Sequence, residues 1–448
     1  MSNGYSRRII FTLNKKTMNK IALILVLTFF TQLSFAFDFE LSSAVKRPGS
    51  NEVFVGGTFN TIIVFDIEKG ETLRWFKIEK GIKDLQFDKK GKTLIAASSS
   101  TVYLIDPDNG NNTGTISGNS FQLFAESPYF VDLKKYGDTK VVLYETDSGK
   151  KLKEVRVGFQ PKICGFNEDF SVLYVVSSKN NISPEDEKKH LFQKVEKSTM
   201  YNCYNQAYTS KQEDNSGAFI YVFDLKNNIE ISTIICPFDF TGTFALSLTP
   251  TDNNIYISDW DMFLKIDDNN ITTAIECPKA GFAYADHTTA NLENIIISST
   301  KSGNIYNIPE SKWIEFNLRE NNELVYTTDI FSTEDRIWLL SKDYTLVSMD
   351  YNGIKDKEFK INYAGEKGFS VYYHNGYSKK EDRDKEAEII NNELKSLSLP
   401  NIDLEQFIGK SDVILATFST VTEAEEFIKN LKNNKLNYIT RIAPAEFD

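Results

Sequence analysis

Histidine and cysteine, the residues that most often carry catalysis or bind metals, are scarce in this chain of 448 residues. The histidines are His190, His287 and His374, and none of the four cysteines stands in a Cys-x-x-Cys spacing. His287, in the segment "YADHTTA", is the best single candidate for a catalytic side chain, although a hydrogen-bonded histidine within a strand would look the same. No nucleophile elbow, phosphate-binding loop or zinc motif is present. The sequence therefore predicts a protein that is not an enzyme and has no cofactor.

Carboxylates are abundant, and one group of them could bind calcium. Asp259 and Asp261 flank Trp260, and Asp267 follows shortly after them. Their spacing differs from that of an EF-hand loop, and solvated turn acids explain them as well. The net charge of -11 is spread along the chain, which argues against a nucleic-acid partner. We therefore expect neither a metal site nor binding to nucleic acid.

A repeating unit must position these side chains, and the segment "VFDIEKGETLRWF" illustrates it. Two alternating apolar runs flank a turn from Asp66 to Gly70, which is the pattern of a β-hairpin. Equivalent hairpins recur about every 41 residues, and two further alternating runs precede each hairpin. The equivalent positions are Asp66, Asp106, Thr146, Asp224, Ile266, Ile308 and Met349. Four short strands per unit and this period predict an all-β fold, a seven-bladed β-propeller over residues 37–363.

The units resemble those of WD-repeat and YVTN-type propellers at the level of the broad class, because the first hairpin has the pattern V-F-D-x-x-x-G. The Gly-His and Trp-Asp marks of true WD repeats are missing. A propeller that holds a quinone cofactor would show recurring tryptophans, and the four tryptophans here do not recur at one position. The resemblance implies a ring of small sheets that pack on one another.

An insertion, residues 181–217, interrupts the fourth unit. Ser183 followed by Pro184 is a good helix start, and Leu191, Phe192 and Val195 would give that helix an apolar stripe. We predict that the insertion extends one face of the ring and binds a partner, although a tolerated surface insertion is an equal alternative. Its candidate contact residues are Leu191, Phe192, Tyr201, Tyr204 and Tyr208.

The cysteines allow two interpretations. Cys164 and Cys203 flank the insertion and could close it with a disulfide. Cys236 and Cys277 occupy equivalent places in neighbouring units, where the Cα atoms are often farther apart than the roughly 7 Å that a disulfide spans. Free or separately buried thiols are therefore favoured for that pair, and they remain an alternative for all four cysteines.

The N-terminal residues 1–36 indicate export. From Met18, a lysine precedes an apolar run that ends in Ser34-Phe35-Ala36, a small-x-small cleavage site. We expect cleavage after Ala36, a periplasmic location and no stable membrane span afterwards. An uncleaved membrane anchor is the alternative. No cysteine follows the cleavage site, which argues against a lipid anchor.

The pattern changes in residues 364–448, where three strands alternate with two helices. The first predicted helix has Ala387, Ile390, Leu394 and Leu397 on one side. The second follows Thr420 or Thr422 as a cap, and its apolar face holds Ala424, Phe427, Ile428 and Leu431. This order predicts a small α+β domain of the ferredoxin-like βαβαβ type, with helices on one face of the sheet.

The second half of this domain resembles the SPOR (sporulation-related repeat) family, because Thr417-Phe418-Ser419 ends a strand where the family has a Gly-Ser-Phe-like triplet. Ala416 stands in place of the glycine. The resemblance implies an exposed sheet face that binds peptidoglycan glycan strands. It implies that Tyr373, Tyr377, Thr417, Phe418 and Ser419 contribute to that face. A generic interaction or packing domain is the alternative.

Three functional hypotheses follow. The first is an exported, non-enzymatic scaffold whose propeller docks an unknown protein and whose C-terminal domain localises it on peptidoglycan. The second is a propeller enzyme, such as a lactonase-like hydrolase, acting on a small metabolite at the central mouth. It would require acids and His287 to converge there. In the third, the C-terminal domain only packs on the first or last propeller unit.

Overall fold

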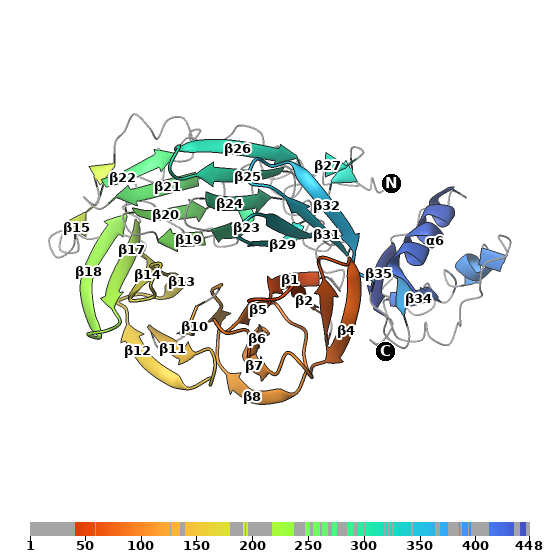
Figure 1. Ribbon diagram of the computed structural model, residues 1–448, viewed down its shortest axis with the longest axis horizontal. Helices are drawn as coiled ribbons and strands as arrows, with labels where there is room; N and C mark the ends of the chain where they lie inside the picture. The colour runs from red at the N-terminus through yellow and green to blue at the C-terminus, as the bar shows by residue number, and fades with distance from the viewer. Residues whose placement is uncertain are drawn as a thin grey trace, which may run out of the picture.

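The structure is a computed structural model. It describes residues 41–58, 60–125, 127–134, 139–179, 191–192, 194–195, 217–236, 247–250, 254–259, 262–267, 271–275, 285–290, 294–299, 302–317, 319–320, 323–324, 327–341, 344–362, 368–374, 385, 388–392, 394–395, 412–433 and 440–444. Figure 1 shows small sheets arranged as a ring, with a C-terminal part beside it. The predicted β-propeller is confirmed.

Each sheet of the ring is a run of antiparallel strands in chain order, and strand order from the axis outward follows the sequence. The first three sheets have the strands β1 (Leu41–Lys46), β2 (Glu52–Gly57), β3 (Thr61–Asp66) and β4 (Glu71–Lys77); β5 (Asp84–Phe87), β6 (Leu94–Ala97), β7 (Thr101–Ile105) and β8 (Asn112–Ser117); and β9 (Phe121–Gln122), β10 (Tyr129–Lys134), β11 (Lys140–Glu145) and β12 (Lys151–Arg156).

The later sheets repeat this order. Their strands are β13 (Pro161–Phe166), β14 (Val172–Lys179), β17 (Gly217–Asp224) and β18 (Ile229–Cys236); β19 (Ser247–Pro250), β20 (Asn254–Asp259), β21 (Met262–Asp267) and β22 (Ile271–Ile275); β23 (Ala285–Ala290), β24 (Asn294–Ser299), β25 (Ser302–Asn307) and β26 (Lys312–Asn317); and β29 (Thr327–Ser332), β30 (Ile337–Ser341), β31 (Thr345–Met349) and β32 (Lys355–Lys360). The strands β27 (Arg319–Glu320) and β28 (Glu323–Leu324) form a short separate hairpin.

The hydrophobic core is divided among the interfaces between neighbouring sheets. Between the β1–β4 and β5–β8 sheets, for example, Phe54 meets Phe87 edge to face with ring centroids 5.0 Å apart, and both rings are buried. The middle strands are buried along their whole length, as in β3, whereas the outer strand β8 is mostly exposed. Each small sheet therefore depends on its neighbours to cover both of its faces.

The glycine of the predicted Asp-to-Gly turn has two functions. Gly70 and Gly110 have φ values of +73° and +76°, a conformation that glycine adopts without a steric penalty. Each also lies against an aromatic ring of the preceding sheet: a Cβ atom would stand 2.7 Å from Phe359 at Gly70 and 2.5 Å from Phe76 at Gly110. The repeated motif thus ends the hairpin and fits it to its neighbour.

Side chains also connect the inner strands of successive sheets. Asp329 Oδ2 accepts the Ala44 N–H at 2.7 Å, and Ser43 Oγ accepts the Leu85 N–H at 3.0 Å. Two glutamine side chains continue the series. Gln86 Oε1 accepts the Phe124 N–H at 2.9 Å, and Gln122 Oε1 accepts the Cys164 N–H at 2.9 Å. These bonds fix the relative positions of the inner strands at the axis.

The described part of the insertion contradicts one prediction. Residues 191–192 and 194–195 are not part of a helix that begins at Ser183, because Leu191–Phe192 (β15) pairs parallel with β18 and Lys194–Val195 (β16) pairs parallel with β22. The two short strands therefore run along the outer edges of two neighbouring sheets (Figure 1). An unpaired edge strand offers backbone hydrogen bonds, and these outweighed the local helix signal.

The C-terminal part forms a three-stranded antiparallel sheet in the order β34 (Asp412–Phe418), β33 (Phe369–His374) and β35 (Thr440–Pro444). The helix α6 (Val421–Asn433) packs on it through Val421, Ala424, Phe427 and Leu431. Thr420 is its cap: the Glu423 N–H donates to Thr420 Oγ1 at 3.2 Å, and Glu423 Oε2 accepts the Thr420 N–H at 3.1 Å. Residues 388–392 are helical, and Ile390 and Leu394 are buried as predicted.

Candidate functional site

A polar cluster, here called the axial cluster, lies on the inner strands near the propeller axis. Ser43 on β1 lies between Asp84 on β5 and Asp329 on β29, and its hydroxyl favours the ionised form of both carboxyl groups. The inner strands bring these residues together because β1 contacts both β5 and β29. Ser43 is buried, whereas the two aspartates are half-buried.

The surroundings of the axial cluster disfavour negative charge. Burial, followed by the charge of Asp329, raises the pKa of Asp84 to about 7. Burial raises the pKa of Asp329 to about 6, against the opposing hydrogen bonds from the Ala44 and Ile330 N–H groups. The charge of either carboxylate opposes ionisation of the other, so the pair can hold one proton between them. Two neighbouring carboxyl groups in opposite protonation states can serve as a proton donor and a proton acceptor.

His287, the candidate catalytic residue, occupies on β23 the backbone position that Asp329 occupies on β29. The inner strands β1, β23 and β29 each have a register shift, and the residues that follow it are Ser43, His287 and Asp329. Since β23 contacts β29, four consecutive inner strands carry His287, Asp329, Ser43 and Asp84 at or near one level. The structure does not describe the side chain of His287, so this residue is not counted in the axial cluster.

Sequence reasoning missed Asp84 and Asp329. An alignment of the inner strands of the units would have indicated them, because "KDLQF" and "TDIFS" have an aspartate in the same column. A single strand gives no reason to prefer one of these acids over the many turn acids.

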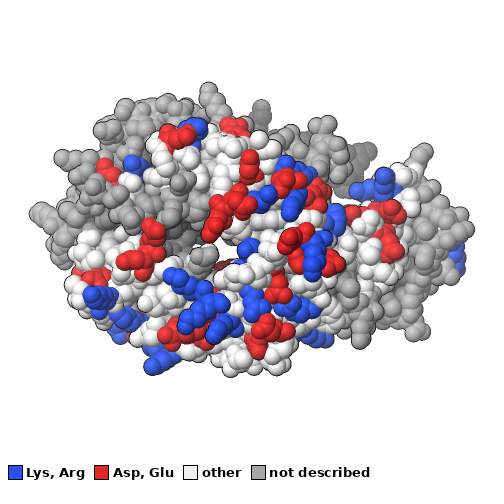
Figure 2. Space-filling model, in the orientation of Figure 1, with Lys and Arg blue, Asp and Glu red and all other residues white. Residues whose placement is uncertain are grey.

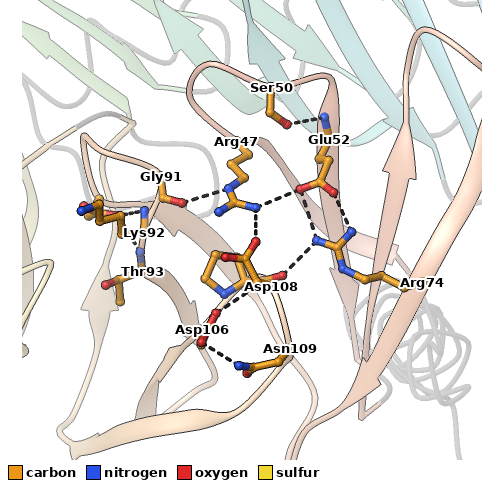
Figure 3. Close-up of polar contacts among 12 residues, drawn as sticks. Arg47, Ser50, Glu52, Arg74, Gly91, Lys92, Thr93, Asp106, Asp108 and Asn109 are labelled. Atoms are coloured by element: carbon orange, nitrogen blue, oxygen red, sulfur yellow. Dashed lines mark hydrogen bonds and ion pairs between the residues drawn. The ribbon is translucent and has the colours of Figure 1, made fainter.

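A second polar group, here called the arginine network, joins the turns of the first two sheets (Figure 3). Arg47 Nη1 lies 3.1 Å from Glu52 and 2.7 Å from Asp108, and its Nε donates to the Gly91 carbonyl at 2.9 Å. Arg74 pairs with Glu52 at 2.6 Å and donates to the Pro107 carbonyl at 3.0 Å. Burial opposes ionisation of Glu52, but the hydrogen bonds from Arg74 and Arg47 hold its pKa below the ordinary value. The network joins two sheets, and its charges are already paired.

The arginine network lies on one face of the ring, here called the turn face. This face consists of the turns at residues 47–51, 67–70, 88–93 and 106–111. Strand alternation places them together, because the turns β1–β2, β3–β4, β5–β6 and β7–β8 all lie at the same end of their sheets. In the view of Figure 2, acidic and basic side chains are interspersed rather than separated by sign, and the ring is hollowed near its centre.

Asp259 and Asp267, two of the carboxylates considered for calcium, lie at opposite ends of one hairpin. Asp259 pairs with Met262 next to the β20–β21 turn, whereas Asp267 pairs with Asn254 at the other end of the same hairpin. The two pairs are five residue steps apart along the strands, about 17 Å, and Asp261 lies outside the described residues. Within the part of the chain that the structure describes, no group of three or more His, Cys, Asp or Glu is arranged to hold a metal ion.

The residues assigned to a glycan-binding face are separated. Tyr373 is only 8% exposed and belongs to the hydrophobic core with Phe369 and Val371, so its assignment to an exposed face is wrong. Thr417 and Ser419 are exposed, but Phe418 is half-buried and packs on Phe427 with ring centroids 5.2 Å apart. Tyr377 lies outside the described residues, as do Tyr201, Tyr204 and Tyr208 of the insertion.

Cys164 is a buried free thiol, and burial raises its pKa. A disulfide between Cys164 and Cys203 is therefore not formed in the structure. Cys203 and Cys277 lie outside the described residues, and Cys236 is the last residue of β18, so the state of Cys236 and Cys277 stays a prediction. Among the helices that the structure describes, none combines the length and apolar character needed to cross a membrane. No protein-family model matches the chain, and no curated protein matches it.

Proposed function

We propose that the protein is a non-enzymatic binding scaffold whose propeller docks another protein on its turn face. One observation supports this most directly: side chains bond the inner strands of successive sheets to one another, from Asp329 and Ala44 to Gln122 and Cys164. A surface held by such a ring changes little on binding, which lowers the entropic cost of association. The insertion connects β14 to β17 at the opposite end of its sheet, so the contacts proposed for it would lie apart from the turn face.

Site-specific photo-crosslinking in the producing cell tests the docking face. A crosslinker replaces Lys90 on the turn face, Ser99 in the β6–β7 turn on the opposite face, or Thr115 on the outer strand β8. All three positions are exposed. We expect a discrete crosslinked species from Lys90 only. Equal yields from the three positions, or a species from Ser99 alone, would refute docking on the turn face.

The second candidate is a hydrolase that acts on a small polar metabolite, such as a sugar lactone, at the central mouth. The axial cluster favours it, because Asp84 as the proton donor and Asp329 as the proton acceptor flank the Ser43 hydroxyl. A panel of lactones and esters should then be hydrolysed by the full-length protein, and Asp329→Asn should abolish turnover without loss of the fold. Turnover that is absent, or unchanged in Asp329→Asn, removes this candidate.

We also propose the finer features of the architecture. Seven blades are supported by the seven sheets of four or five strands among the described residues. A ferredoxin-like βαβαβ order is supported by β33, the helical residues 388–392, β34, α6 and β35 in that sequence. An N-terminal signal and a periplasmic location rest on the sequence pattern alone.

Localisation on peptidoglycan remains a proposal for the C-terminal domain. Its support is the exposed pair Thr417 and Ser419 at the end of β34. Co-sedimentation of the full-length protein with purified sacculi should be reduced at least tenfold by Thr417→Glu with Ser419→Glu. Lys385→Glu, at another exposed position of the domain, serves as the control. Equal sedimentation of both variants would remove the localiser hypothesis.

A further inference from the structure

The ring closes at one junction, here called the seam, where the β29–β32 sheet meets the β1–β4 sheet. Each of these sheets consists of contiguous chain, so the two ends of the propeller do not exchange a strand. The seam is held by Asp329 on Ala44 at the inner strands and by Thr72 Oγ1, which donates to the Asn362 carbonyl at 2.6 Å on the outer side. Between them, the rings of Phe65 and Phe359 lie 5.6 Å apart.

The hydrophobic core at the seam differs from the cores at the other junctions. The buried clusters described elsewhere in the ring each join neighbouring propeller sheets. At the seam, one continuous cluster joins the β1–β4 sheet, the β29–β32 sheet and the C-terminal part. Its members include Val55 and Phe65 of the first sheet, Trp338 and Leu346 of the last sheet, and Phe369, Val371 and Phe427 of the C-terminal part.

Two direct contacts connect the C-terminal part to the last sheet. Phe369 at the start of β33 is fully buried, and its ring meets Tyr344 edge to face with centroids 5.4 Å apart. On the exposed side, Lys360 Nζ at the end of β32 pairs with Glu425 of α6 at 2.8 Å. Gly368 has a φ of +71°, and a Cβ atom there would stand 2.0 Å from the Phe418 carbonyl oxygen, so the entry into β33 requires glycine.

We propose that the C-terminal part is a clasp that holds the seam closed, in place of a strand shared between the first and last sheets. The shared core covers apolar side chains that the two sheets alone would leave exposed at their junction. The clasp is independent of what the turn face binds. A clasp requires that destabilising β33 or α6 opens the seam before it affects the sheets on the far side of the ring.

Hydrogen exchange of the full-length protein tests the clasp. In Phe369→Ala, we expect amide exchange at least tenfold faster in β1, β29 and β31, with little change in β10 and β11 across the ring. The reversal Lys360→Glu should accelerate the same strands by a few-fold, and adding Glu425→Lys should restore their protection. This pair keeps the test informative if Phe369→Ala fails to fold.

Two outcomes would overturn the proposal. Faster exchange confined to β33, β34 and α6 would mean that the C-terminal part unfolds without any effect on the ring. Equal acceleration in every sheet, β10 and β11 included, would mean that the variants destabilise the protein as a whole.

Discussion

The axial cluster predicts that the protein loses stability as the pH rises from about 5 to about 8.5. Asp84 and Asp329 have pKa values of about 7 and about 6 in the folded protein, against an ordinary value of 3.8. The folded state therefore binds protons in this range that the unfolded state has already lost. The stabilisation is complete at low pH and disappears as the pH passes through the two raised values.

The magnitude follows from the pKa values. One pKa unit corresponds to about 1.4 kcal/mol, so between pH 5 and pH 8.5 Asp84 accounts for about 3 kcal/mol and Asp329 for about half as much. Both side chains are half-buried, and screening by the solvent that reaches them reduces the combined loss to about 2 kcal/mol. Asp84→Asn should remove about two thirds of this loss, because the neutral amide cannot ionise.

Urea unfolding of the full-length protein at pH 5 and pH 8.5 measures the effect. Asp108→Asn is the control: Arg47 holds the pKa of Asp108 below its ordinary value, so this carboxyl group is ionised at both pH values. The control should retain the full loss of stability. Stability that is flat or rising between the two pH values, or an Asp84→Asn variant with the same loss as the control, would refute the reasoning.

Three further predictions concern single positions. Gly110→Ala should destabilise the protein by about 2 kcal/mol more than Gly49→Ala in urea unfolding, since both have positive φ but only Gly110 lies against Phe76; equal losses would contradict the packing argument. Thr420→Ala should lower the free energy of local opening of α6, measured by hydrogen exchange, by about 1 kcal/mol, because it removes the cap. Unchanged protection would show that the cap is dispensable. Cys164 should resist maleimide until urea unfolds the protein, because its thiol is buried; rapid labelling of Cys164 in the folded protein would disprove this.

Local signals predicted the hairpins well and the contacts between units poorly. The Asp-to-Gly turns between alternating runs determine β3–β4 and β7–β8 directly, because turn and strands lie next to each other in the chain. Asp84 and Asp329 were missed because their proximity depends on closure of the ring, which joins residues 245 positions apart.

Two errors have physical reasons of their own. Residues 191–195 were assigned to a helix because Ser183 and Pro184 are helix-start signals, yet the open edges of β18 and β22 offered that segment strand pairing. Tyr373 was predicted to lie on an exposed face. Every second residue of a strand lies on the same face, so Tyr373 shares the buried side of β33 with Phe369 and Val371. In both cases the neighbouring surface decided the outcome.

The glycine turns have a consequence for how such a ring can grow. Four of the units present a turn glycine to an apolar side chain of the sheet before them: Gly70 to Phe359, Gly110 to Phe76, Gly149 to Leu104 and Gly353 to Phe316. A copy of one of these four units, inserted beside another of them, would therefore meet a surface that already matches. Duplication of a single unit would create two junctions that already fit, so the number of units can change without new surfaces having to arise.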